Sequence, residues 1–493
     1  MPLALELDSY ARDSERFVSE MDREYYLHFA GHKEEFEIEE IYERHAGLFD
    51  REVVERLRER VSSNGGEETR RARYLLELAV GGLLGRETKR EETELAEREA
   101  ALELEVGGER LPYRQSAVTQ ANEADPERRS AIEEARLDVL ESELNPLHLR
   151  ALERAHELAR ELGWSSYREM YGDLKQIDLA ALERQTSAFL EATAGAYEAT
   201  LEPHLRSQVG FGLDELRRSD LPYFFRARGF DDFFPQERLI EALEGTLGGL
   251  GIVLDEQENV RLDTEQRPLK SPRAFCAPVH VPGEVYLVIP RHGGRDDYAA
   301  LFHEAGHTEH YAHVNAALPF EFRHLGDNSV TEGFAFLFEH LTEDPAWLQA
   351  MLGVTGSEEY AGYARASKLL FLRRYAAKMS YELELHGGRR LSEMPDLYAS
   401  LLGDAVAVDW PARTWLSDVD PGYYVANYLR AWAFETRLRN LLRERFGDEW
   451  FTQPEAGDLL REIWSEGQRL DADELLAQVT GERIDFAVML EEI

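Results

Sequence analysis

Three residues of one short segment have the types and the spacing of a metal-binding motif. His303, Glu304 and His307 form the pattern HExxH within ALFHEAGHTEH. On a helix, residues four apart lie on the same face. The two imidazoles can therefore share one zinc ion, and Glu304 can reach the water that the metal activates. The motif predicts one zinc ion per chain, with Glu304 as the general base.

A catalytic zinc site needs a third protein ligand. Glu332 lies 29 residues after His303, in the apolar helical stretch SVTEGFAFLFE. Glu339 follows two turns later on the same face, and two acids on an apolar helix are costly to bury without partners. We therefore predict that Glu332 is the third ligand, and that Glu339 either orients a ligand or contacts the substrate.

The elements around these residues are predicted to be mostly helical. One helix is predicted to begin at Asn145, which caps it, with Pro146 at the first helical position, and to stop at Gly163. Asp125-Pro126 predicts the start of an earlier helix in the same way. We interpret Gly107-Gly108 as a break between helices. The runs 273–280 and 284–290 are instead rich in Val, Ile, Phe and Tyr, and Pro282-Gly283 between them predicts a hairpin or a pair of small strands just before residue 300.

Charge and cysteine content exclude several classes of partner. The chain of 493 residues has 96 acidic and 56 basic side chains, a net charge of −40. Such a surface repels phosphate backbones and anionic lipid, so we expect neither nucleic acid nor membrane partners. Cys276 is the single cysteine, which fits a reducing compartment. The first residues lack a basic start followed by an apolar run, so we predict a cytoplasmic protein without a signal peptide.

The HExxH segment and the acids that follow it resemble those of a known family. The segment LFHEAGHTEH is similar to the LFHExGHxxH helix of the thimet oligopeptidase and oligoendopeptidase F group, and the acids at Glu332 and Glu339 have that group's spacing. The strand pair before the helix is similar as well, and the resemblance is clear over residues 265–345. It implies a mainly α, two-lobed, neurolysin-like metallopeptidase with a small sheet beside the zinc helix. In that arrangement residues 1–200 form a helical lobe that walls a channel, and residues 201–493 form the catalytic lobe.

A tyrosine segment extends the resemblance. GYYVANY at 422–428 is similar to the segment from which these peptidases supply a phenol to the oxyanion, so Tyr423 or Tyr424 takes that role. Packing of aromatic rings on a helix is the alternative. Family members usually carry a histidine several residues earlier, but here the nearest is His386. Either another residue, for example Arg413, does its work, or the substrate contacts differ.

The function that follows is hydrolysis of short peptides by water activated on zinc. The strand at 284–290 is expected to hold an extended peptide at the sheet edge. Three other functions stay open: an aminopeptidase, although the chain has no GxMxN segment; a metallocarboxypeptidase of the thermostable type; and a helical binding protein with a relict zinc site. His310 is predicted to be structural or to support a ligand, and Cys276 to be a small buried residue.

Overall fold

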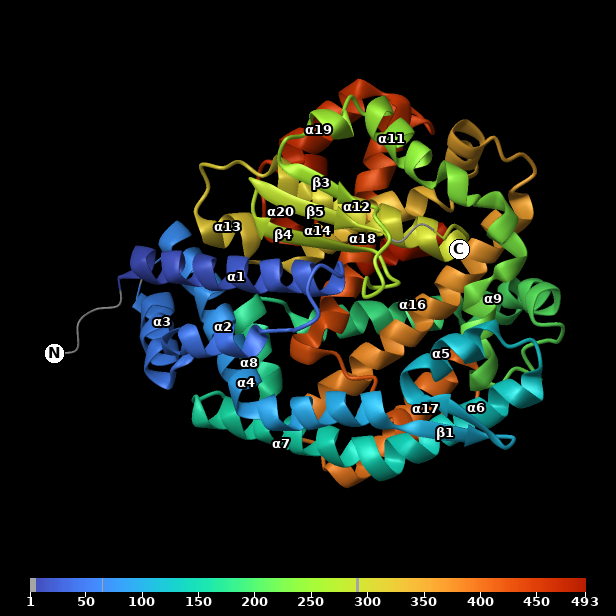
Figure 1. Cartoon of the computed structure of the whole chain (residues 1–493), viewed down its shortest axis with the longest axis horizontal. Coiled ribbons are helices and arrows are strands. Elements are labelled where there is room, and N and C mark those ends of the chain that lie inside the picture. The colour runs from blue at the N-terminus through green and yellow to red at the C-terminus, as the bar shows by residue number, and fades with distance from the viewer. Residues whose placement is uncertain (1–5, 64, 290–291) are drawn as a thin grey trace. The chain divides into compact units, whose positions relative to one another are not determined.

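The computed structural model describes residues 6–63, 65–289 and 292–493 (Figure 1). The protein is mainly helical, with 72% helix and 5% strand, as the sequence predicts. It divides into two compact units: unit 1 contains Met1–Gly82, Phe230–Ala361 and Arg430–Val488, and unit 2 contains Leu83–Gly229, Gly362–Leu429 and Met489–Ile493. Both units draw on segments from either side of residue 200, so they differ from the sequential lobes 1–200 and 201–493.

Unit 1 consists of helices around one small sheet. Its elements are α1 (Leu7–Phe29), α2 (Ile38–Arg44), α3 (Arg51–Ser63), α11 (Leu239–Gly249), β3 (Val260–Asp263), β4 (Phe275–His280), β5 (Glu284–Val288), α12 (Arg295–His313), α13 (Phe320–His324), α14 (Asn328–Leu341), α15 (Pro345–Trp347), α19 (Pro454–Trp464) and α20 (Ala472–Thr480). Helices α4 (Glu67–Ala101), α16 (Glu358–His386) and α18 (Tyr424–Phe446) contain the unit boundaries.

The sheet of unit 1 has the strand order β3-β5-β4. β4 and β5 form the antiparallel hairpin that the sequence predicts, and Pro290 at the end of the predicted strand lies outside the described residues. The expectation that this second strand is a sheet edge is wrong. β3 pairs with β5 in parallel, so β5 is central. β3 was not predicted: its sequence VRLD alternates apolar and polar residues, but over four residues only, the shortest run that indicates a strand.

Helices cover both faces of this sheet. Tyr26 of α1 stacks on Tyr286 at 3.8 Å between ring centroids, so α1 lies against the face that carries Tyr286. Figure 1 shows α1 running along β4. Helix α12 packs against β4 and β5 as well, and next to α14. The sheet therefore lies directly beside the helix that contains the HExxH motif.

Unit 2 is helical apart from one hairpin. Its elements are β1 (Glu103–Val106), β2 (Glu109–Pro112), α5 (Tyr113–Asn122), α6 (Pro126–Val139), α7 (Asn145–Glu161), α8 (Tyr167–Lys175), α9 (Leu179–Gln208), α10 (Leu221–Arg226) and α17 (Met394–Val406). β1 and β2 are antiparallel, and Gly107 and Gly108 between them have φ of 60° and 83°. Two consecutive positive φ values form a tight hairpin turn. The two glycines lie between helices α4 and α5, as predicted, but the sequence did not predict the β-hairpin that they turn.

The helix signals of unit 2 are confirmed in part. Asp125 caps α6 by accepting a hydrogen bond from the Glu127 amide at 3.0 Å, and Gly163 with φ of 91° follows the end of α7. Asn145 is not a cap, because one turn of π-helix joins α6 to α7 without a break. Its side-chain amide instead donates to the Arg413 carbonyl at 2.8 Å. Within the described residues, no helix has the length and hydropathy required to cross a membrane.

Candidate metal centre

Two adjacent helices of unit 1 carry the predicted zinc ligands. His303 and His307 lie on α12, and Glu332 lies on α14. Asp327 caps α14 by accepting from the Ser329 amide at 2.9 Å. The two backbones come unusually close at Gly306, where an added Cβ would lie 2.4 Å from the Phe334 carbonyl oxygen. Only glycine permits this approach, which brings Glu332 within reach of both histidines.

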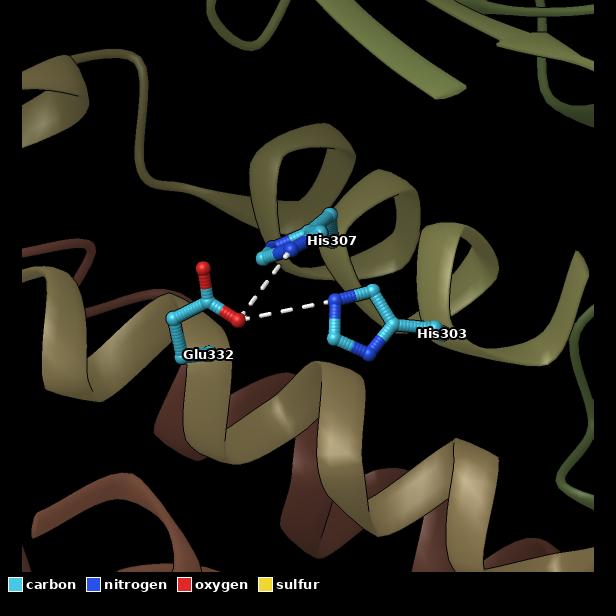
Figure 2. Close-up of side chains that lie close together, drawn as sticks. All are labelled: His303, His307 and Glu332. Carbon is cyan, nitrogen blue, oxygen red and sulfur yellow. Dashed lines mark ion pairs between the residues drawn. The ribbon is translucent and has the colours of Figure 1, made fainter. Parts of the chain in front are cut away.

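The three predicted ligands converge on one point (Figure 2). Glu332 Oε2 lies 3.5 Å from His303 Nε2 and 3.8 Å from His307 Nε2, and all three ligand atoms lie within 4.8 Å of one another. Two ligands of a tetrahedral zinc ion, each at about 2.0–2.1 Å, are separated by roughly 3.3 Å. The cluster is close to that spacing. Within the described residues, no second group of three or more His, Cys, Asp or Glu meets it.

Hydrogen bonds at the far side of each imidazole orient the rings. His303 Nδ1 lies 2.8 Å from Glu339 Oε2, and His307 Nδ1 lies 2.8 Å from Thr331 Oγ1. When each Nδ1–H donates to its partner, the lone pair of each Nε2 faces the cluster, which is the state a metal requires. Glu339 therefore contacts a predicted ligand. The sequence did not predict the contact of Thr331 with His307, because the spacing of Thr331 does not distinguish it from the other neighbours of Glu332.

The pKa values of the two histidines move in opposite directions. Burial lowers the pKa of His307 to about 4, so its imidazole is neutral at pH 7. Burial also opposes the charge on His303, but the carboxylates of Glu332 and Glu339 outweigh it and raise the pKa of His303 well above its ordinary value. A metal that binds at Nε2 of His303 must therefore displace a proton.

Glu304 lies between the cluster and the sheet. Its Oε2 accepts a hydrogen bond from the Cys276 backbone amide of β4 at 2.8 Å. Burial raises the pKa of Glu304 to about 7, with a smaller contribution in the same direction from Glu332 and Glu339. The contact with Cys276 is made by the backbone. The residue is half-buried, so the prediction that it is buried is wrong. A carboxylate oriented in this way can exchange a proton near neutral pH.

The predicted tyrosines belong to unit 2. Tyr423 is fully buried, its hydroxyl lies 3.4 Å from the Glu382 carbonyl oxygen, and its φ of 57° is unusual for a residue with a side chain. His386, distant in sequence, packs edge-on against the Tyr423 ring at 5.0 Å. Tyr424 is half-buried and packs edge-on against Tyr428 at 4.8 Å. The role of either phenol at the metal centre stays a prediction.

Two further residues from the sequence predictions have structural contacts. The guanidinium of Arg413 forms ion pairs with Glu134 at 2.7 Å and Asp138 at 2.8 Å within unit 2. His310 is buried in unit 1, with Nε2 3.4 Å from the Gly467 carbonyl oxygen. Burial lowers the pKa of His310 to about 3, so this histidine is neutral and packs inside the unit.

No model of a known protein family matches the chain, and no curated protein matches it. Inference about function therefore rests on the cluster of His303, His307 and Glu332 and on the residues that contact it.

Proposed function

We propose that this chain is a zinc-dependent peptidase of the thimet oligopeptidase and oligoendopeptidase F type, which hydrolyses short peptides. The convergence of His303, His307 and Glu332 with Glu304 beside them carries the proposal. The proposal includes the two-lobed architecture with a channel that the resemblance implies. A catalytic zinc site requires three protein ligands and an adjacent base, and this set of side chains fits both requirements.

The ligand set suits zinc better than it suits harder cations. Two imidazole nitrogens with one carboxylate oxygen are ligands typical of zinc enzymes, whereas calcium and magnesium take oxygen ligands. Glu339 and Thr331 would keep the two rings in place and fix which nitrogen is protonated. When bound, zinc supplies Lewis acidity, which polarises a carbonyl group and makes water more acidic.

The remaining residues have separate tasks in this proposal. Glu304 accepts a proton from the attacking water and passes it to the leaving amine, and the Cys276 amide holds the carboxylate in position for both transfers. Tyr423 or Tyr424 is the proposed donor of a hydrogen bond to the oxyanion.

The sheet edge next to the site is β4, so β4 takes the peptide-binding role first expected of the strand at 284–290. The Cys276 amide points away from β5, toward Glu304. The pairing of β4 with β5 is irregular between Ala277 and His280, and Pro278 in this stretch has no N–H. Because the Cys276 amide already donates to Glu304, an extended peptide would donate its own amides to carbonyl groups of this edge, which would place a peptide bond beside Glu304.

A comparison of two glutamine variants tests the proposal. Glu304→Gln should retain zinc but lose about 10²-fold or more in kcat on a mixture of short peptides analysed by mass spectrometry. Glu309→Gln is the matched control. Glu309 is on the same helix and buried, but its carboxylate accepts from the Gln257 side chain at 3.1 Å. If zinc-loaded wild type cleaves no peptide, or if Glu304→Gln is as active as wild type, the proposal is wrong.

A further inference from the structure

An exposed group of aromatic rings lies where α1 meets the start of β4. We call it the α1 aromatic cluster, and it consists of Tyr25, His28, Phe29, Phe36 and Phe275. Its members form a chain of ring contacts, with Tyr25 stacked on Phe29 at 5.7 Å, His28 stacked on Phe36 at 4.6 Å and Phe29 packed edge-on against Phe275 at 6.4 Å.

This cluster is unusual for its exposure. Tyr25 is 40% exposed and Phe29 is 38% exposed. Seven large hydrophobic side chains are exposed in the described part of the chain, and these two are the only aromatic ones among them. A third, Leu269, is close by, because the Ser271 amide donates to the Phe29 carbonyl at 2.7 Å. Exposed apolar groups gathered in one place indicate a binding surface.

The cluster is continuous with the edge strand beside Glu304. Phe275 immediately precedes Cys276, whose amide bonds Glu304. Side chains alternate between the two faces of a strand. Phe275 pairs with Val288 and packs against Phe29 on the α1 face, so the next residue directs its side chain to the α12 face. A peptide paired with β4 would likewise place every second side chain on the α1 face, over Phe275 and Phe29.

From this continuity we infer that the α1 aromatic cluster binds an aromatic side chain of the peptide substrate. The inference rests on the proposed function. Adjacent residues of a strand are about 3.3 Å apart, so the bound side chain belongs to a residue within one or two positions of the cleaved bond. Aromatic rings gain from edge-on and offset stacking beyond the area they bury, which favours Phe or Tyr over aliphatic residues.

The inference is tested with a series of short fluorogenic peptides and zinc-loaded full-length protein. In each peptide one position is varied, and it carries Phe, Leu, Gly or Asp. The varied position is one of the two residues before the cleaved bond or one of the two residues after it. At one position, wild type should favour Phe over Gly by about tenfold or more in kcat/KM. Phe29→Ser should reduce that ratio to about twofold, and Phe29→Leu should give an intermediate ratio.

Val253→Ser is the control, because Val253 is 50% exposed in unit 1 but belongs to no part of the cluster. It should leave the Phe preference unchanged. Equal cleavage of all peptides by wild type would overturn this inference alone, as would a Phe29→Ser protein that loses the same factor on every peptide. If wild type cleaves none of the series, the proposed function fails and the inference fails with it.

Discussion

Replacing Gly306 with alanine tests how the metal centre is assembled. The added Cβ would lie 2.4 Å from the Phe334 carbonyl oxygen and 2.6 Å from the Ala335 Cα, both backbone atoms of α14. Carbon and oxygen normally approach to about 3.3 Å, so α12 and α14 must separate by about 0.9 Å. Glu332 lies two residues before Phe334 and would move with the helix, away from both histidines.

The expected magnitude combines two opposing effects. Overpacking a close contact costs about 1–3 kcal/mol, whereas alanine stabilises a helix by about 1 kcal/mol relative to glycine. Gly81→Ala isolates the second effect, because Gly81 lies in the part of α4 that belongs to unit 1 and a Cβ there would meet nothing within 4 Å. We expect Gly81→Ala to raise the free energy of unfolding. Gly306→Ala should be less stable than Gly81→Ala by about 1–3 kcal/mol.

Urea unfolding of the zinc-free proteins measures this difference, and competition with a chromophoric chelator measures zinc affinity. Gly306→Ala should weaken zinc binding about tenfold or more, because the third ligand is displaced. Gly81→Ala should bind zinc as wild type does. If the two variants are equally stable and bind zinc equally, the close approach of the helices does not position Glu332, and the reasoning is refuted.

Three further predictions concern the same helices. Glu332→Ala removes one proposed ligand and should abolish stoichiometric zinc by elemental analysis; undiminished zinc would rule out Glu332 as a ligand. Thr331→Val keeps the shape of the side chain but removes the hydrogen-bond partner of His307 Nδ1. Zinc affinity in a chelator competition should therefore fall about 10–100-fold, and an unchanged affinity would show that Thr331 does not position His307. Burial opposes the charge on Asp327, but the Arg430 guanidinium and backbone donors outweigh it and lower its pKa from 3.8 to about 2. Because the folded pKa is below the unfolded one, this stabilisation is present above pH 4 and is lost as pH falls toward 2, by about 2 kcal/mol in all. In urea unfolding, the difference in the free energy of unfolding between wild type and Asp327→Asn should therefore become smaller as pH falls from 4 to 2. A constant difference would contradict the lowered pKa of Asp327.

Local spacing was sufficient to predict several features. His303 and His307 share a helical face because they are four residues apart, and the same geometry aligns Glu332 with Glu339 on α14. The cap at Asp125, the end of α7 near Gly163 and the β4–β5 hairpin also follow from residues close together in sequence. Each of these features depends on contacts within a few residues, where backbone geometry leaves few alternatives.

The tertiary structure decided which neighbours those residues meet. Three contacts at the site join different elements: Thr331 with His307, Gly306 with α14, and the Cys276 amide with Glu304. The periodicity of a single helix or strand does not predict contacts of this kind. The parallel pairing of β3 made β5 a central strand, and the continuous helix through Asn145 replaced the expected cap. A sequence pattern defines the face that an element presents. The partner of that face depends on how distant segments pack, and packing is a property of the whole fold.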